Sequence, residues 1–179
     1  MNNIASLAKA YSLAAHWHST QRRKGNAAEP YVNHLAEVAH LIAETTGDVD
    51  ITIAAVLHDA IEDAGVTAAQ IEVEFGARVA VIVLEVTDDK SQPKAERKRL
   101  QVETTPSKSP AAKMLKLADK TSNLRAILHS PPAWPHERKV EYLAWARRVV
   151  SGARCVSPQL EEIFDAAAQD LEGALAAKA

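Results

Sequence analysis

Cysteine is almost absent from this sequence: Cys155 is the single one among 179 residues. One thiol excludes an internal disulfide framework and a cysteine-rich zinc site. A lone free thiol fits a reducing compartment, so we expect a cytoplasmic protein. Any bound metal must therefore be held by imidazole and carboxylate groups, which seven histidines and 23 acidic residues supply.

Glycine and aromatic residues are also scarce, with 6 glycines and 4% aromatic residues. So few glycines do not suit a turn-rich β sandwich, whereas the abundant alanine favours helices and disfavours strands. No stretch approaches the ~18 uninterrupted apolar residues of a membrane span. We therefore predict a single all-α domain over residues 1–179, with about eight to nine helices and no membrane partner.

A strong excess of one charge is missing too, since 21 basic and 23 acidic residues give a formal net charge of -2. This balance argues against a surface built for nucleic acid, so we expect no nucleic-acid partner. The basic residues nevertheless form two groups: Arg22, Arg23 and Lys24, and then Lys90, Lys94, Arg97, Lys98 and Arg99. Such groups suit a polyanionic ligand. The alternative for the second group is a solvated helix face.

Apolar residues at helical spacing predict eight or nine helices. Asp50 is expected to cap the third, Thr67 and Gln70 form a capping box, and Ser109 with Pro110 opens a later helix. The β-branched run 79–86 resembles a strand, but we read it as a buried helix because the chain offers it no partner strand. The predicted helices cover residues 4–18, 30–47, 51–63, 67–76, 79–86, 93 onward, 109–119, 138–150 and 160–175.

Four ionisable side chains follow the apolar run that begins at Ala54: His58, Asp59, Glu62 and Asp63. Three carboxylates this close repel one another, so their burial without a cation would be costly. Imidazole and carboxylate oxygen together suit manganese, iron or zinc. A solvated acidic helix end is the alternative reading.

Two further ligands would have to come from other helices. His34 stands at the start of the second predicted helix, and Asp119 at the end of an apolar helical run. Taken singly, His34 reads as a capping or packed histidine and Asp119 as a salt-bridge acid. A site with four protein ligands favours a six-coordinate manganese or iron ion, because a four-coordinate zinc would have no open position.

The order of these residues resembles the HD superfamily of metal-dependent phosphohydrolases, and within it the alarmone hydrolases of the RelA/SpoT type. The sequence resembles in particular the small stand-alone form, typified by the metazoan SpoT homologue. The motifs that carry the resemblance span nearly the whole chain: 21–24, 30–34, 58–63, 75–76, 85–90, 93–101, 116–125, Trp134 and 141–145.

The resemblance implies a role for each matched position in an HD-domain helical bundle. It implies that one manganese ion is bound by His34, His58, Asp59 and Asp119. It implies that Glu62 and Asp63 position and deprotonate the attacking water. The substrate pocket would be lined by Arg23, Lys24, Asn123, Lys94, Arg138 and Tyr142.

The sequence departs from the family pattern at two places. Leu35 follows His34 where the family usually has proline, and we expect this to alter only a helix turn. Thr121 and Ser122 replace a bulkier pair, which we expect to reshape the pocket for the base.

The resemblance implies hydrolysis of guanosine tetra- and pentaphosphate, (p)ppGpp, at the 3′ position, with release of pyrophosphate and GDP or GTP. Two alternatives stay open. An HD phosphatase acting on another nucleotide, such as NADPH, would share the metal site but release orthophosphate. A non-catalytic alarmone-binding regulator would bind nucleotide without turnover. The sequence leaves the oligomeric state open.

Overall fold

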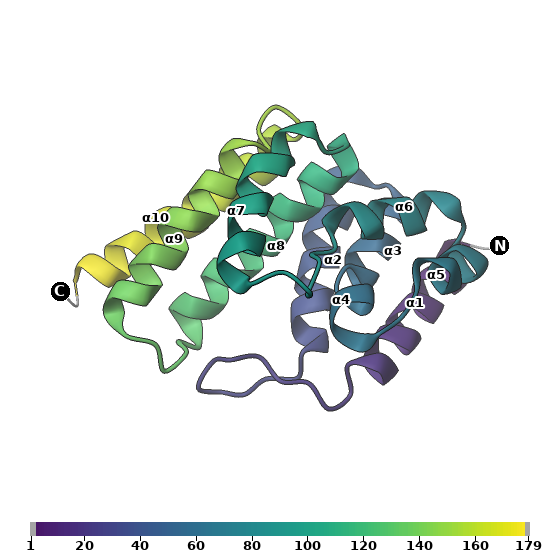
Figure 1. The fold of residues 1–179 in the computed structure, drawn as a ribbon, viewed down its shortest axis with the longest axis horizontal. Helices are drawn as coiled ribbons and strands as arrows, with labels where there is room; N and C mark the ends of the chain where they lie inside the picture. The colour runs from purple at the N-terminus through teal and green to yellow at the C-terminus, as the bar shows by residue number, and fades with distance from the viewer. Residues whose placement is uncertain (1–2, 178–179) are drawn as a thin grey trace.

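The computed structural model describes residues 3–177, and it confirms the all-α prediction (Figure 1). All nine predicted helices are present, one of them broken in two, and a short 3₁₀ turn is added. The elements are α1 (Asn3–Trp17), α2 (Val32–Thr46), α3 (Val49–Leu57), α4 (Ala60–Ala64), α5 (Ala68–Phe75), α6 (Ala77–Val86), α7 (Lys94–Thr104), η1 (Thr105–Ser107), α8 (Pro110–His129), α9 (His136–Ser151) and α10 (Pro158–Ala176).

The predicted caps account for several helix ends. Thr67 and Gln70 form the reciprocal capping box at the start of α5. Ser109 accepts a hydrogen bond from the Ala112 N–H at the start of α8. The β-branched segment 79–86 lies in helix α6, and most of its side chains are buried. The two caps were predictable because each depends on residues within one turn of one another, whereas the helix over 79–86 was predicted because the chain offers no partner strand.

The prediction of one continuous helix over 51–63 is wrong in two respects. The helix begins earlier, and it is interrupted before its end. Asp48, not Asp50, is the N-cap, and it accepts hydrogen bonds from two backbone N–H groups. The chain leaves the helix at Leu57 and re-enters at Ala60, with Asp59 at φ -99° and ψ 0°. His58 Nδ1 donates to the Ala55 carbonyl at 2.8 Å, a local bond that competes with the helical ladder. The break lies at the two residues of the His-Asp pair.

Helix α8 is longer than predicted, and Asp119 therefore lies in its middle rather than at its end. The polar residues that follow Asp119 suggested a helix terminus. They are instead buried and hydrogen-bonded: Thr121 donates to the Leu117 carbonyl at 2.8 Å, and Ser122 lies fully inside. Buried polar groups need partners, and here the helix and its neighbours supply them.

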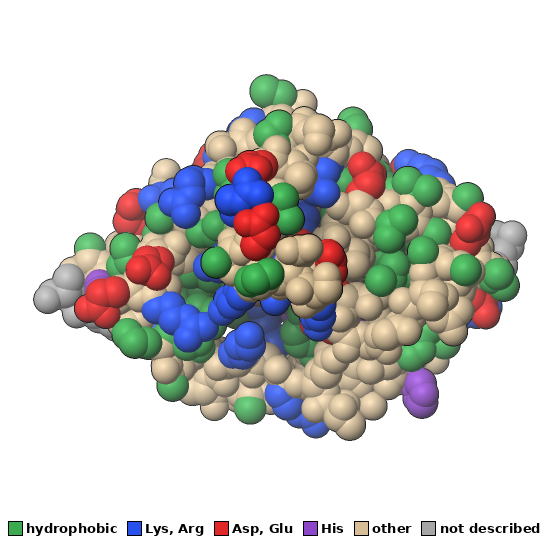
Figure 2. All heavy atoms as spheres, viewed as in Figure 1, with side chains coloured by type: hydrophobic (Ala, Val, Ile, Leu, Met, Phe, Trp, Pro, Cys, Tyr) green, Lys and Arg blue, Asp and Glu red, His purple; other side chains and the backbone are tan. Residues whose placement is uncertain are grey.

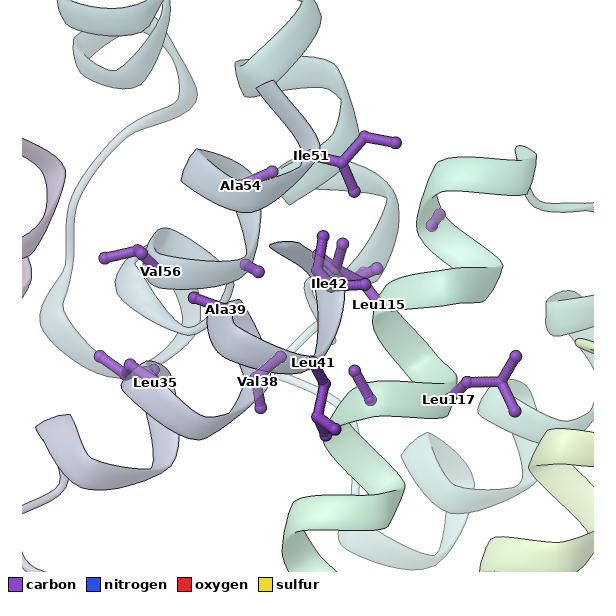
Figure 3. Packing of buried hydrophobic residues seen from close by; sticks show 14 of the residues in the cluster. Leu35, Val38, Ala39, Leu41, Ile42, Ile51, Ala54, Val56, Leu115 and Leu117 are labelled. Carbon is purple, nitrogen blue, oxygen red and sulfur yellow. The ribbon is translucent and has the colours of Figure 1, made fainter. Parts of the chain in front are cut away.

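The core lies where α2, α3 and α8 meet (Figure 3). Leu35, Val38 and Ile42 come from α2, Ala54 from α3 and Leu115 from α8, and all are buried. Helix α10 packs along α8, while α1 and α5 lie at the opposite end of the molecule from α9 and α10 (Figure 1). This core holds the helices that carry the histidines and Asp119 in fixed relative positions.

Helix α7 differs from the other long helices because it has no buried residue. The indole Nε1 of Trp145 donates to the Lys98 carbonyl at 3.0 Å and ties α7 to α9. Within residues 3–177, the only β contacts are two isolated bridges, Arg22 with Pro30 and Gly25 with Pro132. No helix in the described part of the chain has the length and apolar content needed to cross a membrane.

Candidate active site

Three of the predicted metal ligands lie together at the break between α3 and α4. One ligand atom each from His34, His58 and Asp59 lies within 4.8 Å of the others. His58 Nε2 is 3.1 Å and His34 Nε2 is 3.8 Å from Asp59 Oδ2. The two imidazole rings meet edge to face with centroids 5.2 Å apart, and both are almost fully buried.

The hydrogen bonds of His58 test whether this cluster fits a metal. The Ala55 carbonyl can only accept, so the ring proton of neutral His58 is on Nδ1 and the lone pair is on Nε2. That Nε2 atom is buried, has no hydrogen-bond partner and faces a carboxylate oxygen. A lone pair against a carboxylate is stable only with a cation between them. The donor set therefore fits a divalent ion.

The pKa values of His58 and Asp59 also indicate a site for a cation. Burial by itself lowers the pKa of His58, but the charge of the adjacent Asp59 carboxylate outweighs this and raises it to about 9. Burial alone would raise the pKa of Asp59, whereas the charge of His58 holds it well below its usual range. Asp59 is also fixed by the Tyr31 hydroxyl, which donates to Oδ2 at 2.7 Å. The cluster thus carries a negative charge that attracts either a proton or a metal.

Asp119 approaches the same His34 nitrogen as Asp59 does, although it is not part of the three-residue group. Its Oδ1 is 3.4 Å from His34 Nε2 and accepts from Asn123 Nδ2 at 2.6 Å. Its Oδ2 accepts from the ammonium of Lys120 at 2.8 Å. Burial opposes ionisation, but Lys120 and His34 hold the pKa of Asp119 well below its usual range. The structure therefore brings all four predicted ligands together, Asp119 through its contact with His34.

The acid pair Glu62 and Asp63 lies on α4, directly after the cluster. Glu62 Oε1 accepts from Arg97 Nη1 at 3.1 Å, and its Oε2 accepts from the Asp88 N–H at 3.3 Å. Burial and the nearby carboxylates of Asp88 and Asp59 raise the pKa of Glu62. Asp63 pairs with Lys90.

The solvated-face reading of the second basic group is wrong for Arg97. This side chain is 24% exposed, and it contacts a predicted catalytic acid. The interpretation as a solvated helix face holds for Arg99, which pairs with Glu96 and Glu103 on the surface of its own helix. Both residues carry the same charge on one basic helix, so composition alone could not separate them.

Lys and Arg side chains gather around a hollow on the face that Figure 2 shows. Burial and the charges of Arg138, Lys24 and Arg97 lower the pKa of Lys94, which places these groups near one another. The Arg138 guanidinium lies 4.3 Å from the Trp134 ring centroid. Arg22 does not join them, because its guanidinium donates to the carbonyls of Ser19 and Gln21.

Two predicted pocket residues lie closer to the metal cluster than the sequence suggested. Arg23 Nη2 lies 3.4 Å from Asn123 Oδ1, and the Asn123 amide is bound to Asp119. Ser122, expected to reshape the base pocket, is instead buried behind His34, with its Oγ 2.9 Å from His34 Nδ1.

Trp145 is buried, and two ammonium groups lie over its ring. Lys120 Nζ is 4.5 Å and Lys98 Nζ 4.6 Å from the ring centroid. Tyr142, a predicted pocket residue, packs edge to face on the same ring at 5.3 Å. The Lys120 ammonium is also paired with Asp119, whereas the cation–π contact holds Lys98 without neutralising it, so the Lys98 charge stays available to an anion.

Comparison with known proteins identifies the family. Residues 10–144 match the family model described as HD domain. The chain belongs to the HD domain family. Among its HD-family relatives, the guanosine-3′,5′-bis(diphosphate) 3′-pyrophosphohydrolase MESH1 of Mus musculus is 47% identical over 164 residues, covering 90% of this chain and 92% of that protein. The MESH1 of Drosophila melanogaster is 41% identical over 164 residues, with the same coverage of 90% and 92%.

A solved structure from this group agrees with the fold. The structure of a metazoan ortholog of SpoT that hydrolyses ppGpp has a TM-score of 0.87 and 40% identity to the chain, covering 91% of this chain and 93% of that one. The resemblance inferred from the motifs is thus confirmed, and this HD domain protein is a relative of the small alarmone hydrolases.

Proposed function

We propose that this HD protein is a metal-dependent hydrolase of guanosine tetra- and pentaphosphate that releases pyrophosphate from the 3′ position. The observation that carries the proposal is the His34, His58 and Asp59 cluster with the acid pair on α4 beside it. The identity with the MESH1 hydrolases over 90% of the chain supports the substrate. In this reaction a water oxygen bonds to the phosphorus attached to O3′, the O3′–P bond breaks, and O3′ takes a proton.

Family membership and the donor set indicate a divalent metal, and we propose one manganese ion per chain. His34, His58 and Asp59 would hold it, with Asp119 as the fourth ligand. When bound, such an ion polarises the phosphate and makes a water more acidic. Two imidazoles with two carboxylates suit manganese, whereas the absence of cysteine ligands disfavours a structural zinc.

The remaining residues would share the proton transfer and the binding of substrate. Glu62 would take the proton of the attacking water, because a carboxylate with a raised pKa is a better base near neutral pH. Asp63 would orient the same water. Arg23, Lys24, Lys94 and Arg138 would neutralise the diphosphates, and Tyr142 and Asn123 would contact the nucleoside.

The test is a product assay on metal-stripped protein. The protein is incubated with ppGpp, with and without manganese, and the phosphorus species are identified by ³¹P NMR. We expect pyrophosphate only when manganese is present. Orthophosphate from NADPH with no action on ppGpp would replace the proposal by the phosphatase alternative, and ppGpp binding without turnover would replace it by the regulator alternative.

A double variant tests the acid pair. Glu62→Ala with Asp63→Ala should abolish pyrophosphate release while circular dichroism shows an intact helical fold. Glu44→Ala is the matched control, because this acid is exposed on α2 away from the cluster. Turnover by the double variant at the parental rate would refute the mechanism.

The proposal extends to the protein as a whole. We infer a single HD-type domain over residues 1–179 that acts on a small nucleotide rather than on nucleic acid. The single cysteine fits a reducing compartment, so we propose a cytoplasmic location.

A further inference from the structure

Ser122 lies at the centre of a buried polar group behind His34. Its side chain is on α8, it is fully buried, and its hydroxyl contacts side chains from two other segments. Oγ is 2.9 Å from His34 Nδ1, 2.6 Å from Glu37 Oε2 and 3.2 Å from Arg23 Nη1. None of the predicted roles uses this hydroxyl.

The chemistry of these neighbours determines where the protons are. An ionised carboxylate only accepts, so the Ser122 hydroxyl proton points to Glu37. The guanidinium of Arg23 only donates, so it uses one lone pair of Oγ. The remaining lone pair must accept from His34, whose proton is therefore on Nδ1. Each of the three bonds has one donor and one acceptor.

The consequence appears on the other side of the imidazole ring. With the proton on Nδ1, Nε2 of His34 carries the lone pair, and this atom faces Asp119 Oδ1 at 3.4 Å and Asp59 Oδ2 at 3.8 Å. His58 has the same arrangement, with Nδ1 bound to the Ala55 carbonyl. The His58 partner is a backbone group within one turn, whereas His34 depends on side chains from α2 and α8.

Glu37 is itself held in place, which makes the arrangement rigid. It follows His34 by three positions on α2, so both side chains project from the same face of that helix. Its Oε1 accepts from Arg125 Nη1 at 3.2 Å, which leaves Oε2 for Ser122. Arg23 adds a second bond, from Nη2 to the Ser122 carbonyl at 3.3 Å.

We infer that Ser122 and Glu37 are positioning residues that hold His34 in its Nδ1–H tautomer and aim Nε2 at the metal cluster. The inference rests on the proposed metal site. Side chains that orient a metal-bound histidine typically contribute 10- to 100-fold to metal affinity. Arg23, a predicted substrate-binding residue, and His34, a predicted metal ligand, both hydrogen-bond to the Ser122 hydroxyl oxygen.

The first test measures manganese affinity by the electron paramagnetic resonance signal of the free ion. We expect Ser122→Ala to weaken binding by about 10- to 100-fold. Ser122→Thr keeps a hydroxyl and should restore most of the affinity. Thr121→Val is the matched control, because it removes the neighbouring buried hydroxyl, which contacts only the Leu117 carbonyl. Equal affinity in Ser122→Ala and the parent would refute the inference.

The second test follows the tautomer directly in metal-free protein, through long-range ¹H–¹⁵N correlations of the His34 ring. The parent should show the Nδ1–H pattern. Glu37→Gln should increase the Nε2–H form, because an amide can donate to Oγ and turn the hydroxyl proton toward Nδ1. An Nε2–H pattern in the parent, or no change in Glu37→Gln and Ser122→Ala, would overturn the inference.

These measurements do not depend on turnover. If the parent protein fails to hydrolyse ppGpp but shows the expected tautomer and manganese losses, the proposed substrate is wrong and the positioning role stands. If hydrolysis occurs and Ser122→Ala behaves like the parent in both tests, the positioning role is wrong and the proposed function stands.

Discussion

Arg97 Nη1 donates a hydrogen bond to Glu62 Oε1 across 3.1 Å, joining α7 to α4 over 35 sequence positions. Helix α7 has no buried residue, so polar contacts such as this one determine where it lies. Gln101 adds a second contact, from its amide to Asp88 Oδ2, and Asp88 in turn donates its N–H to Glu62. The basic helix and the predicted catalytic base are thus parts of one hydrogen-bonded group.

Arg97→Met should shift the acid limb of the rate profile toward higher pH. Burial already raises the pKa of Glu62, and loss of the neighbouring cation raises it further. Less of the carboxylate is then ionised at low pH. We expect kcat at pH 6 to fall by about tenfold and the difference to shrink at pH 9.

Arg99→Met is the control for this prediction. It removes the same charge from the same helix, but Arg99 pairs only with Glu96 and Glu103 on the surface. Its rate profile should match that of the parent. A pH-independent loss in Arg97→Met would instead indicate that Arg97 binds substrate rather than supporting Glu62.

Manganese affinity should increase with pH. Asp59 raises the pKa of His58 to about 9, so metal-free His58 is protonated near neutral pH. A binding metal must displace that proton, and the affinity should rise by about tenfold for each pH unit below this value. Calorimetry between pH 6 and 8 measures the slope. An affinity independent of pH would mean that His58 is neutral in the metal-free protein.

Lys116 should make the stability depend on pH above neutrality. Its ammonium is buried and donates to the Val86 carbonyl at 2.9 Å, and burial lowers its pKa to about 8. Between pH 8 and its ordinary value of 10.5, the unfolded chain holds a proton that the folded chain has released. The free energy of unfolding should therefore rise with pH across this window, by at most about 3 kcal/mol.

Lys116→Met removes this titration. Urea unfolding at pH 7 and pH 9.5 should show a smaller gain in stability for the variant than for the parent. The same gain in both proteins would show that Lys116 titrates alike in the folded and unfolded chains.

Gly25→Ala should weaken substrate binding through a clash between two loops. A Cβ at this position would lie 2.2 Å from the Ser130 carbonyl oxygen and 2.4 Å from Ser130 Oγ. The loop that carries Arg23 and Lys24 would have to move away from the α8–α9 connection. We expect KM to rise more than kcat falls, with about 1–3 kcal/mol lost in stability.

Gly173→Ala gives the contrasting case. This glycine lies within α10 with open space around its missing side chain. Alanine there should stabilise the protein by about 0.5–1 kcal/mol and leave KM unchanged. Thermal unfolding and steady-state kinetics of both variants check the pair, and a stable Gly25→Ala protein with parental KM would contradict the loop argument.

Local sequence determined the helices and the types of the site residues. The Thr67 and Gln70 capping box and the Ser109 cap act within one turn, so they could be read before any tertiary contact was known. The adjacent pair His58 and Asp59 likewise marked the metal cluster, because neighbouring residues stay close in any fold. The order of the motifs then predicted the family.

Only the tertiary structure decided which distant side chains meet. Arg97 and Arg99 are equivalent in composition, yet one contacts Glu62 and the other stays on the surface. Ser122 contacts His34 across 88 positions, and the helix breaks at Asp59, directly before α4 with the acid pair. Such contacts depend on how whole helices pack, and helix packing is set by the shape of the shared core rather than by the few residues at the point of contact.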